Sequence, residues 1–379
     1  MKVFLIAGEV SGDKLGGALM AGLQSLEQTV SFEGVGGPLM QSHGLESQFP
    51  MEELSLMGIS EILPKYFHLK RRIRETADAI IAAEPDVLIT IDSPDFCLRV
   101  AKLVKEKSDI PTVHYVAPTV WAWRAGRARK MSRYIDHVLA LFPFEPPFMQ
   151  EAGMTCDFVG HPIVGEKVAT DSEAHQFRTD LEIGDAPLCL VLPGSRRGEV
   201  ARLSETFSAV LERVSAKHPK ARFALPCAAP VEKLVREITE NWTVKPILIS
   251  AHEHAAKRAA FKAANFALAA SGTVSLELAA AETPMVIAYD MSWLSRQIIS
   301  RMLRVDTVTL VNLVSDTRVV PEFIGANCQP EPIAEALSSV LDDPTSQFAA
   351  MRTTMQRLGL GGEAPGLRAA RSVLQVVNT

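Results

Sequence analysis

The short motif Gly194-Ser195-Arg196 combines groups that bind phosphate in proteins. It follows the apolar run 188–192 and opens a helical pattern. The glycine therefore permits a sharp turn, and the first N–H groups of the helix point at any anion that binds there. Arg196 can add a charge-assisted contact to the same phosphate. Taken alone, the motif also fits an ordinary strand–turn–helix corner with an arginine that faces solvent.

A second turn in the same half of the chain, Ser271-Gly272-Thr273, follows another apolar run and starts another helix. Ser271 and Thr273 suit an N-cap position, where the helix end again attracts an anion. Glu277 lies about one helical turn beyond Thr273, so its carboxylate can reach the hydroxyls of a ribose. It also fits a surface glutamate that the helix dipole favours. Two anion sites with an acid beyond them favour a nucleoside diphosphate as the ligand.

Asp92 is the candidate catalytic base of the first half. It ends the apolar run 87–91, and ligands of open parallel sheets bind beyond the carboxyl ends of the strands. A carboxylate in that position can accept a proton from a hydroxyl nucleophile. Its neighbour Asp95 precedes the next helical pattern, and we interpret it as a helix cap.

The turn after the first apolar run is crowded with small and polar residues, namely Glu9, Ser11, Gly12 and Asp13. These residues either shape the acceptor side of a binding site or cap the helix that follows. The turn is not a GxGxxG motif, which disfavours a nicotinamide cofactor. No set of His, Cys and Asp residues has the spacing of metal ligands. We therefore expect neither a cofactor nor a metal.

Alternating strands and helices must position these residues. Short apolar runs alternate with longer helical patterns, as is typical of a parallel α/β sheet. Strands are expected at 3–7, 87–91, 112–116, 138–141, 188–192, 223–225, 247–249, 266–269 and 285–288. Helices are expected at 16–26, 71–83, 96–107, 124–134, 202–217, 230–240, 253–263, 274–281, 332–341, 345–358 and 367–377. The polar stretch 169–175 is interpreted as a linker.

A chain of 379 residues is long for one core, and its length favours two domains. Because each half starts with a strand that runs into a glycine turn, we expect two Rossmann-like parallel-sheet domains facing an interdomain cleft. The expected boundaries are 1–165 for an acceptor-side, membrane-facing domain and 166–344 for a nucleotide-binding domain. Residues 345–379 are expected to form helices that cross back.

Composition indicates which ligands and which cellular compartment to expect. The formal net charge is −5, so charge gives no support to a nucleic-acid-binding role. The five cysteines are an odd number without CxxC spacing, which favours free thiols in a reducing compartment. No signal-peptide pattern and no long apolar run is present, so we expect a cytoplasmic protein, with contact to a membrane surface left open.

One segment mixes bulky apolar residues with cations, as membrane-surface helices do. The candidate contact residues are Leu63, Tyr66, Phe67, Leu69, Lys70 and Arg71. A second segment joins Trp123 and Arg124 to a run of further cations. Each segment also fits an ordinary amphipathic helix packed on its own domain, and composition does not decide between the two interpretations.

A series of motifs resembles the lipid-A-disaccharide synthase family, in that family's order and over nearly the whole chain. The motifs are Ala7-Gly8-Glu9-Val10-Ser11-Gly12-Asp13, Met57-Gly58, Ile91-Asp92-Ser93-Pro94-Asp95-Phe96, Val120-Trp121-Ala122-Trp123-Arg124, Gly160-His161-Pro162, Pro193-Gly194-Ser195-Arg196 and Ser271-Gly272-Thr273. The first and fourth are highly specific. The resemblance implies a GT-B fold and an inverting transfer from a UDP-linked diacylglucosamine to diacylglucosamine 1-phosphate. The product would be a β-1,6-linked disaccharide 1-phosphate, with UDP released.

The resemblance also implies roles for individual residues. Asp92 matches the family's important aspartate and Arg196 its UDP-contacting arginine, while Glu277 and Asn312 match its downstream acid and asparagine. Trp123 and Arg124 would lie on the acceptor side. The family further implies a peripheral association with the inner membrane and a homodimer that exchanges C-terminal segments.

Two other functions remain open on the sequence. One is another GT-B enzyme, such as a UDP-sugar 2-epimerase or a transferase with a soluble acceptor. The other is a sugar-nucleotide-binding module without catalytic activity. An epimerase would convert the donor without any acceptor, and a binding module would bind the UDP-sugar without turnover.

Overall fold

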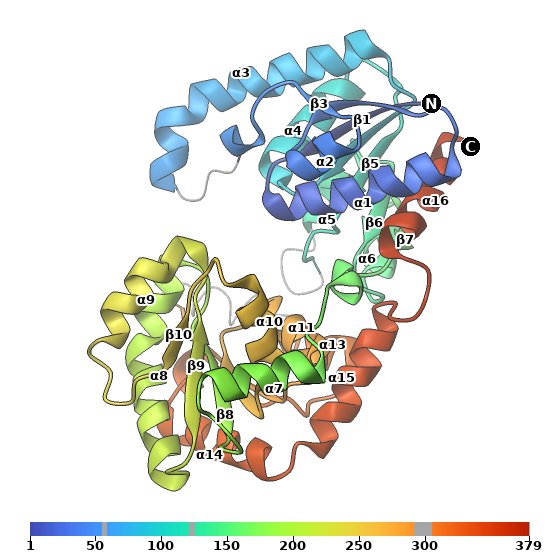
Figure 1. Cartoon of the computed structure of the whole chain (residues 1–379). Coiled ribbons are helices and arrows are strands. Elements are labelled where there is room, and N and C mark those ends of the chain that lie inside the picture. The colour runs from blue at the N-terminus through green and yellow to red at the C-terminus, as the bar shows by residue number, and fades with distance from the viewer. Residues whose placement is uncertain (55–58, 121–125, 292–304, 379) are drawn as a thin grey trace. The chain divides into compact units, whose positions relative to one another are not determined.

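The computed structural model describes residues 1–54, 59–120, 126–291 and 305–378, without the side chains of residues 59–66. In these ranges the chain forms two compact units, Met1–Gly165 with Gly361–Thr379, and Glu166–Leu360 (Figure 1). Each unit contains one sheet of parallel strands with helices packed on it. This confirms the predicted α/β class with two Rossmann-like domains.

The first unit is built on a seven-stranded sheet, counted over the described residues. Its strands are β1 (Lys2–Ala7), β2 (Ser31–Val35), β3 (Glu46–Ser47), β4 (Val87–Ile91), β5 (Thr112–Tyr115), β6 (His137–Ala140) and β7 (Thr155–Phe158). Its helices are α1 (Val10–Leu26), α2 (Pro38–Ser42), α3 (Ile59–Ala83), α4 (Pro94–Lys105), α5 (Gly126–Met131), α6 (Pro146–Glu151) and α16 (Pro365–Val377). The strand order is β3-β2-β1-β4-β5-β6-β7.

The middle of this sheet is buried because helices cover it. All five residues of β4 are buried, as is typical of parallel strands with helices on both faces. Helices α3 and α4 contribute Ile80 and Val100 to the same core as Phe4 of β1. Helix α1 packs closely on the end of β4, since a Cβ on Gly12 would lie 3.5 Å from the carbonyl oxygen of Ile91.

The second unit is built on a six-stranded sheet, again over the residues that the structure describes. Its strands are β8 (Leu188–Leu192), β9 (Arg222–Pro226), β10 (Ile247–Ile249), β11 (Phe266–Ala269), β12 (Met285–Tyr289) and β13 (Glu322–Ile324). Its helices are α7 (Asp171–Asp180), α8 (Arg197–Lys217), α9 (Glu232–Thr239), α10 (His254–Ala263), α11 (Val274–Ala280), α13 (Leu310–Ser315), α14 (Pro330–Asp342) and α15 (Thr345–Arg357). The strand order is β10-β9-β8-β11-β12-β13.

The C-terminal segment divides between the two units. Helix α15 belongs to the second unit, whereas the chain from Gly361 onward, including α16, returns to the first. Helix α16 lies beside α1 (Figure 1), and the two backbones approach so closely that a Cβ on Gly22 would lie 2.6 Å from the Gly366 carbonyl oxygen. The hydroxyl of Ser372 adds hydrogen bonds to Asp157 at 2.6 Å and to His137 at 2.8 Å. The segment expected at 345–379 is thus split near residue 360.

The predicted linker at 169–175 is wrong, because α7 begins inside it. Thr170 is the N-cap of α7: its hydroxyl accepts a hydrogen bond from the Glu173 N–H, and the Glu173 carboxylate accepts one from the Thr170 N–H. This reciprocal pair is a capping box, which satisfies N–H groups that a helix start leaves without partners. The polar character of the stretch reflects a helix cap rather than a linker.

Candidate active site

Asp92 and the Gly8 turn meet at one point of the first sheet. Strands β1 and β4 are neighbours in the sheet, with Ala7 paired to Ile91, and the strand order reverses between them. In open α/β sheets, ligands bind beyond the carboxyl ends of the strands at such a switch point. The structure therefore brings the predicted base and the predicted acceptor-side turn to the position where this fold class binds ligands.

Asp92 has an unusual backbone and a half-buried carboxyl group. Its φ is +50°, that of Ser93 is +43°, and the Asp92 N–H donates to the Tyr115 carbonyl oxygen at 3.0 Å. Burial raises the pKa of the Asp92 carboxyl group, and a hydrogen bond from the Ser93 N–H opposes that rise. Gly8 is required beside this corner, since a Cβ there would lie 2.5 Å from the Ser93 hydroxyl oxygen.

The polar residues of the first turn have different environments. Asp13 is buried, and its carboxylate accepts hydrogen bonds from the N–H groups of Gly37 and Met40 at 2.9 and 3.0 Å and from Leu39 at 3.0 Å. These bonds cap the start of α2, so Asp13 stabilises the fold around the turn. Glu9 is the N-cap of α1 and is partly exposed, while Ser11 is exposed. The latter two side chains remain accessible to a ligand.

The two predicted phosphate turns of the second unit are also neighbours. Strands β8 and β11 are paired with Leu192 opposite Ala269, and the strand order of this sheet reverses between them. The Ala270 N–H donates to the Leu192 carbonyl oxygen at 2.8 Å, so the pairing continues to the point where both turns begin. Gly194 and Gly272 have φ values of +114° and +141°, which favour glycine. The two turns therefore lie side by side at the carboxyl edge of the second sheet.

Arg196 is the N-cap of α8 and presents a 70% exposed side chain. Its guanidinium lies 3.1 Å from the carboxylate of Glu199, one turn into the same helix. Ser195 is exposed beside it. The ion pair is a surface contact of modest strength, so a pyrophosphate can compete for the guanidinium.

Glu277 lies on α11, just beyond the second turn. Its carboxylate pairs with the ammonium group of Lys257 of α10 at 2.8 Å, and its side chain is 39% exposed. Ser271 is partly exposed, whereas Gly272 and Thr273 are exposed. The predicted N-cap hydrogen bond of Thr273 is not formed, and the Ser275 hydroxyl instead donates to the Gly272 carbonyl oxygen at 2.9 Å.

Asn312 is placed differently from a ligand-contacting residue. It is buried, and its amide makes two bonds to the backbone of Val320: Nδ2 donates to the carbonyl oxygen at 2.9 Å, and Oδ1 accepts from the N–H at 3.1 Å. Its Nδ2 also lies 3.2 Å from the carboxylate of Glu322. In this structure Asn312 fastens α13 to the segment before β13.

Two residues near these edges were not identified from the sequence. Ser93 is one, and its position before Pro94, which disfavours right-handed helical backbone, is the available signal. Tyr289, at the end of β12, is the other. Burial raises the pKa of its hydroxyl, the Glu199 carboxylate raises it further, and the Arg196 guanidinium lowers it. Tyr289 stands at the carboxyl end of β12, the strand beside β11, and no local pattern marks it.

Comparison with known proteins decides the family. The family model described as lipid-A-disaccharide synthetase matches residues 3–371. A lipid-A-disaccharide synthase of Ruegeria pomeroyi is 61% identical over 99% of this chain and 95% of its own length. One of Rhodospirillum centenum is 44% identical over 99% and 94%. The chain belongs to the lipid-A-disaccharide synthase family.

Solved structures confirm the GT-B fold of this family member. The UDP-GlcNAc 2-epimerase of Neisseria meningitidis, bound to UDP-GlcNAc, is similar with a TM-score of 0.65 and 13% identity over the whole of both chains. The UDP-GlcNAc 2-epimerase of Methanocaldococcus jannaschii is similar with a TM-score of 0.61 and 13% identity over the whole of both chains. At this identity the likeness concerns the fold alone. Membership of the family identifies the chain as a glycosyltransferase.

The structure describes only some of the candidate membrane-contact residues, which lie on α3 and in the segment that contains Trp123 and Arg124. Phe67 of α3 is 81% exposed, and Lys70 and Arg71 are exposed beside it, whereas Leu69 is half-buried against the core of its own unit. The side chains of Leu63 and Tyr66 lie outside the described residues, as do Trp123 and Arg124 entirely. Among the helices that the structure describes, none has the length and apolar character needed to cross a bilayer.

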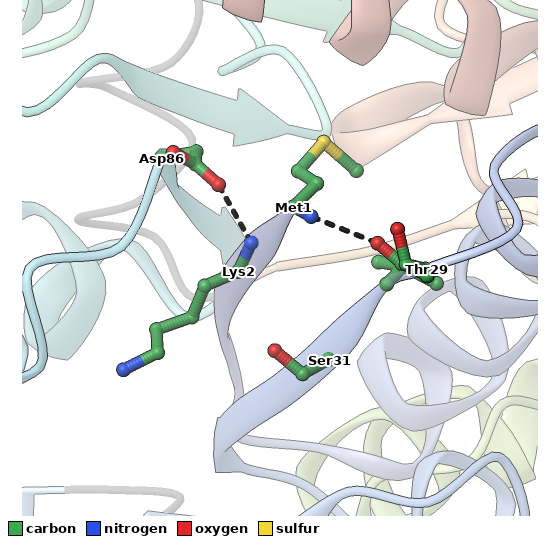
Figure 2. Close-up of a pocket in the computed structure, with 6 residues that line it drawn as sticks. Met1, Lys2, Thr29, Ser31 and Asp86 are labelled. Carbon is green, nitrogen blue, oxygen red and sulfur yellow. Dashed lines mark hydrogen bonds between the residues drawn. The ribbon is translucent and has the colours of Figure 1, made fainter.

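One open hollow in the described part of the chain lies away from these edges. It has a volume of about 460 Å³ and is lined at the amino ends of β1 and β2 by Met1, Lys2 and Ser31. Figure 2 shows the Met1 amino group donating to the Thr29 carbonyl oxygen and the Lys2 backbone N–H donating to Asp86. The predicted site residues of the first unit stand at the opposite, carboxyl ends of the strands, so we do not assign this hollow to catalysis.

Proposed function

We propose that this glycosyltransferase moves a diacylglucosamine unit from its UDP derivative to diacylglucosamine 1-phosphate. The products are UDP and a β-1,6-linked, acylated disaccharide 1-phosphate. One observation carries the proposal: the residues that match the family's motifs stand at both switch points, with Asp92 at one and Arg196 and Gly272 at the other.

The second unit holds UDP in this proposal. The Gly194 and Gly272 turns lie against the pyrophosphate, and the Arg196 guanidinium leaves Glu199 to bind a phosphate oxygen. Departure of UDP increases the negative charge on its β-phosphate, and donors fixed there stabilise a charge that grows in the transition state. Glu277 accepts hydrogen bonds from the ribose hydroxyls and keeps its ion pair with the Lys257 ammonium group, 2.8 Å away.

The first unit supplies the base. The acceptor's 6-hydroxyl attacks the anomeric carbon from the face opposite UDP, and Asp92 accepts the proton from that hydroxyl. Burial supports this role, because the raised pKa of the Asp92 carboxyl group makes its carboxylate a stronger base than an exposed aspartate. Glu9 and Ser11 flank the same edge and contact the acceptor sugar.

Asn312 has a supporting role in this scheme. Because its amide hydrogen-bonds to the Val320 backbone, we propose that it holds α13 in place and does not touch UDP. Replacement by alanine would leave buried backbone groups of Val320 without partners, which costs about 1–3 kcal/mol of stability for each group. Loss of activity in such a variant would accompany loss of stability.

Product analysis tests the proposed function. The protein is incubated with the UDP-linked donor, with and without acylated glucosamine 1-phosphate, and the products are identified by mass. We expect the disaccharide 1-phosphate and UDP only when both substrates are present, and almost none with Asp92→Asn. Conversion of the donor without acceptor would establish an epimerase instead, and binding without conversion would establish a binding module.

We also propose that the chain works at the cytoplasmic surface of the inner membrane. The five cysteines are buried and form no disulfide in the described chain, which supports a reducing compartment. Exposed Phe67 beside Lys70 and Arg71 supports contact with anionic lipid. Phe67→Ser should weaken binding to anionic vesicles, while Leu39→Ser, an exposed leucine on α2, serves as the control. Equal vesicle binding by wild type and Phe67→Ser would remove this contact.

A homodimer that exchanges C-terminal segments is a further proposal from the family. The chain passes from the second unit to the first near Gly359 and Gly361, both with positive φ, and α16 then packs on α1. Exchange would leave the packing of α16 on an α1 helix unchanged and would reroute only this connection. Light scattering at several concentrations distinguishes a dimer from a monomer.

A further inference from the structure

Left-handed backbone in residues other than glycine occurs at two kinds of place in the described chain. Among those residues the positive-φ positions are Glu84, Asp92, Ser93, Val116, Glu182, Glu282 and Asp316. Glu84 follows α3, Glu182 follows α7, Glu282 follows α11, and Asp316 is the C-cap of α13. A left-handed residue is common where a helix ends, because it lets the chain leave the helix and satisfies the last carbonyl groups. Those four positions are therefore explained by the fold.

The other three positions, Asp92, Ser93 and Val116, do not follow a helix. They stand at the carboxyl ends of β4 and β5, which are neighbouring strands, at φ values of +50°, +43° and +84°. Side chains with a Cβ rarely adopt such backbone, and for a β-branched residue such as Val116 it is a marked outlier. Conformations of this kind persist only where the surroundings impose them, and they concentrate at functional sites.

Hydrogen bonds and packing hold the corner in this state. The Asp92 N–H donates to the Tyr115 carbonyl oxygen, and the Val116 N–H donates to the Leu139 carbonyl oxygen, each at 3.0 Å. The first bond ties the Asp92 corner to β5, and the second ties the end of β5 to β6. Ser93 is confined from the other side by the backbone of Gly8, where a Cβ would lie 2.5 Å from the serine hydroxyl oxygen.

The side chain of Ser93 gives the fold no compensating hydrogen bond. Its hydroxyl oxygen is buried and has no hydrogen-bond partner among the described residues, although Ser93 is the N-cap of α4, where a serine hydroxyl usually accepts a hydrogen bond. A buried hydroxyl without a partner destabilises a protein, and a left-handed serine adds to that cost. Stability of the fold therefore does not account for this corner.

We propose that Ser93 is a positioning residue for the transfer reaction, and that its left-handed backbone fixes the Asp92 carboxylate over the switch point between β1 and β4. The inference rests on the proposed role of Asp92 as the base. Ser93 touches neither substrate in this account. It acts through the backbone, because its left-handed conformation, packed against Gly8 and next to the bond that ties Asp92 to β5, restricts where Asp92 can place its carboxylate.

Replacement of Ser93 by glycine tests the proposal. Glycine accepts left-handed backbone without strain but also leaves the corner free to move, so Ser93→Gly folds while losing the restriction. We expect its kcat to fall by about tenfold or more, since a misplacement of about 1 Å at a reacting group can lower a rate by about 10²-fold. The KM for both substrates should stay within about twofold, because neither substrate contacts Ser93.

Glu84→Gly is the matched control. Glu84 lies in the connection between α3 and β4, away from the carboxyl edge of the sheet, and its φ of +47° lies between those of Asp92 and Ser93. This variant relieves the same kind of backbone strain away from the site and should change the melting temperature without changing kcat. Ser93→Ala keeps the Cβ and the restricted backbone, so its kcat should exceed that of Ser93→Gly by about tenfold.

A second readout does not depend on turnover. The pKa of the Asp92 carboxyl group is followed by carbon NMR, with Asp92→Asn used to assign the signal. In Ser93→Gly the carboxylate loses its fixed place in the half-buried corner, so this pKa should shift from its wild-type value, whereas Glu84→Gly should leave it unchanged. If the wild-type protein shows no transfer at all, the proposed function fails. The pKa of Asp92 in Ser93→Gly still tests whether Ser93 positions the Asp92 carboxylate.

The outcomes separate cleanly. A lower kcat at constant KM together with a shifted Asp92 pKa supports the proposal. Wild-type kcat and wild-type Asp92 pKa in Ser93→Gly, with only the melting temperature changed, would overturn it, because Ser93 would then be structural. Equal losses of kcat in Ser93→Gly and Ser93→Ala would also overturn it, since the hydroxyl and not the backbone would be responsible.

Discussion

At the carboxyl edge of the first sheet the residues with positive φ include Asp92 and Ser93, whereas at the same edge of the second sheet they include the glycines Gly194, Gly272 and Gly325. Glycine adopts such backbone without strain, and the N–H groups of the second edge are therefore displayed at little cost. Asp92 and Ser93 adopt it under strain that neighbouring strands impose. The same topological position is thus built relaxed in one unit and strained in the other.

The two edges also differ in exposure and charge. The Arg196 side chain is 70% exposed, while Asp92 is half-buried and burial raises the pKa of its carboxyl group. A phosphate site gains from cations and N–H groups that a diffusing anion can reach, and a general base gains from partial removal from water. The comparison indicates that the second edge binds and the first edge reacts.

The largest effect is expected at Asp92. Asp92→Asn should lower turnover by roughly 10²-fold or more, because general-base catalysis contributes about 10²–10⁴-fold. The melting temperature at neutral pH should not fall, since the variant replaces a half-buried charge with a neutral amide. Asp95→Asn on the exposed first turn of α4 is the control. Turnover within a few-fold of wild type in Asp92→Asn would contradict the assignment of the reaction to the edge of the first sheet.

A smaller effect, on the affinity for UDP, is expected at Arg196. Arg196→Ala should weaken UDP binding by about 1.5–3 kcal/mol, the contribution of a charged hydrogen bond. Arg197→Ala, at the exposed first position of α8, provides the neighbouring control and should have a milder effect. Calorimetric titration with UDP measures both. Equal losses at the two positions would show that the wrong arginine has been assigned.

The glycines of the second edge should tolerate substitution unequally. Gly194→Ala combines unfavourable backbone with a contact of 2.8 Å to the Glu199 carboxylate, whereas Gly272→Ala meets nothing within 4 Å. Strained backbone alone costs about 1–3 kcal/mol for each residue. Thermal unfolding should therefore show a larger loss for Gly194→Ala than for Gly272→Ala, and UDP titration should follow the same order. The reverse order would contradict the geometry of the first phosphate turn.

The smallest effect is expected in the pH profile. Activity requires the Asp92 carboxylate, and burial raises the pKa of that group, so activity should fall on acidification at a higher pH than for an ordinary aspartate. UDP affinity should not follow the titration of Asp92, because Asp92 does not contact the nucleotide in this account. Parallel measurement of kcat/KM and of UDP binding between pH 4 and pH 8, a range chosen to span that titration, tests the separation.

The sequence predicts the fold well where strands are continuous apolar runs. Val87–Ile91 and Leu188–Leu192 were placed at the observed bounds, because buried parallel strands need apolar residues on both faces. The short strand Ser31–Val35 is not predicted, because only Phe32 and Val35 are apolar in it and its other residues are polar or glycine. Helix α1 begins at Val10 and not at Gly16, because the glycines of its first turns pack on β4 and carry no amphipathic pattern.

The site is predictable to the extent that topology places it. Asp92, Gly194 and Gly272 end or follow apolar runs, and parallel pairing carries such residues to a common edge. The roles of Asp13 and Asn312 could not be predicted from local sequence. Asp13 accepts a hydrogen bond from Gly37, 24 residues away, and Asn312 bonds to the backbone of Val320. Tertiary contacts of this kind turn a polar side chain near a site into a structural one.

A titration of UDP into Asp92→Asn and Arg196→Ala tests the division of labour most directly. The account predicts a Kd for UDP within about twofold of wild type in Asp92→Asn and about tenfold or more weaker in Arg196→Ala, the equivalent of about 1.4 kcal/mol or more. A Kd that weakens as much in Asp92→Asn as in Arg196→Ala would contradict the account, because the first edge would then bind the nucleotide.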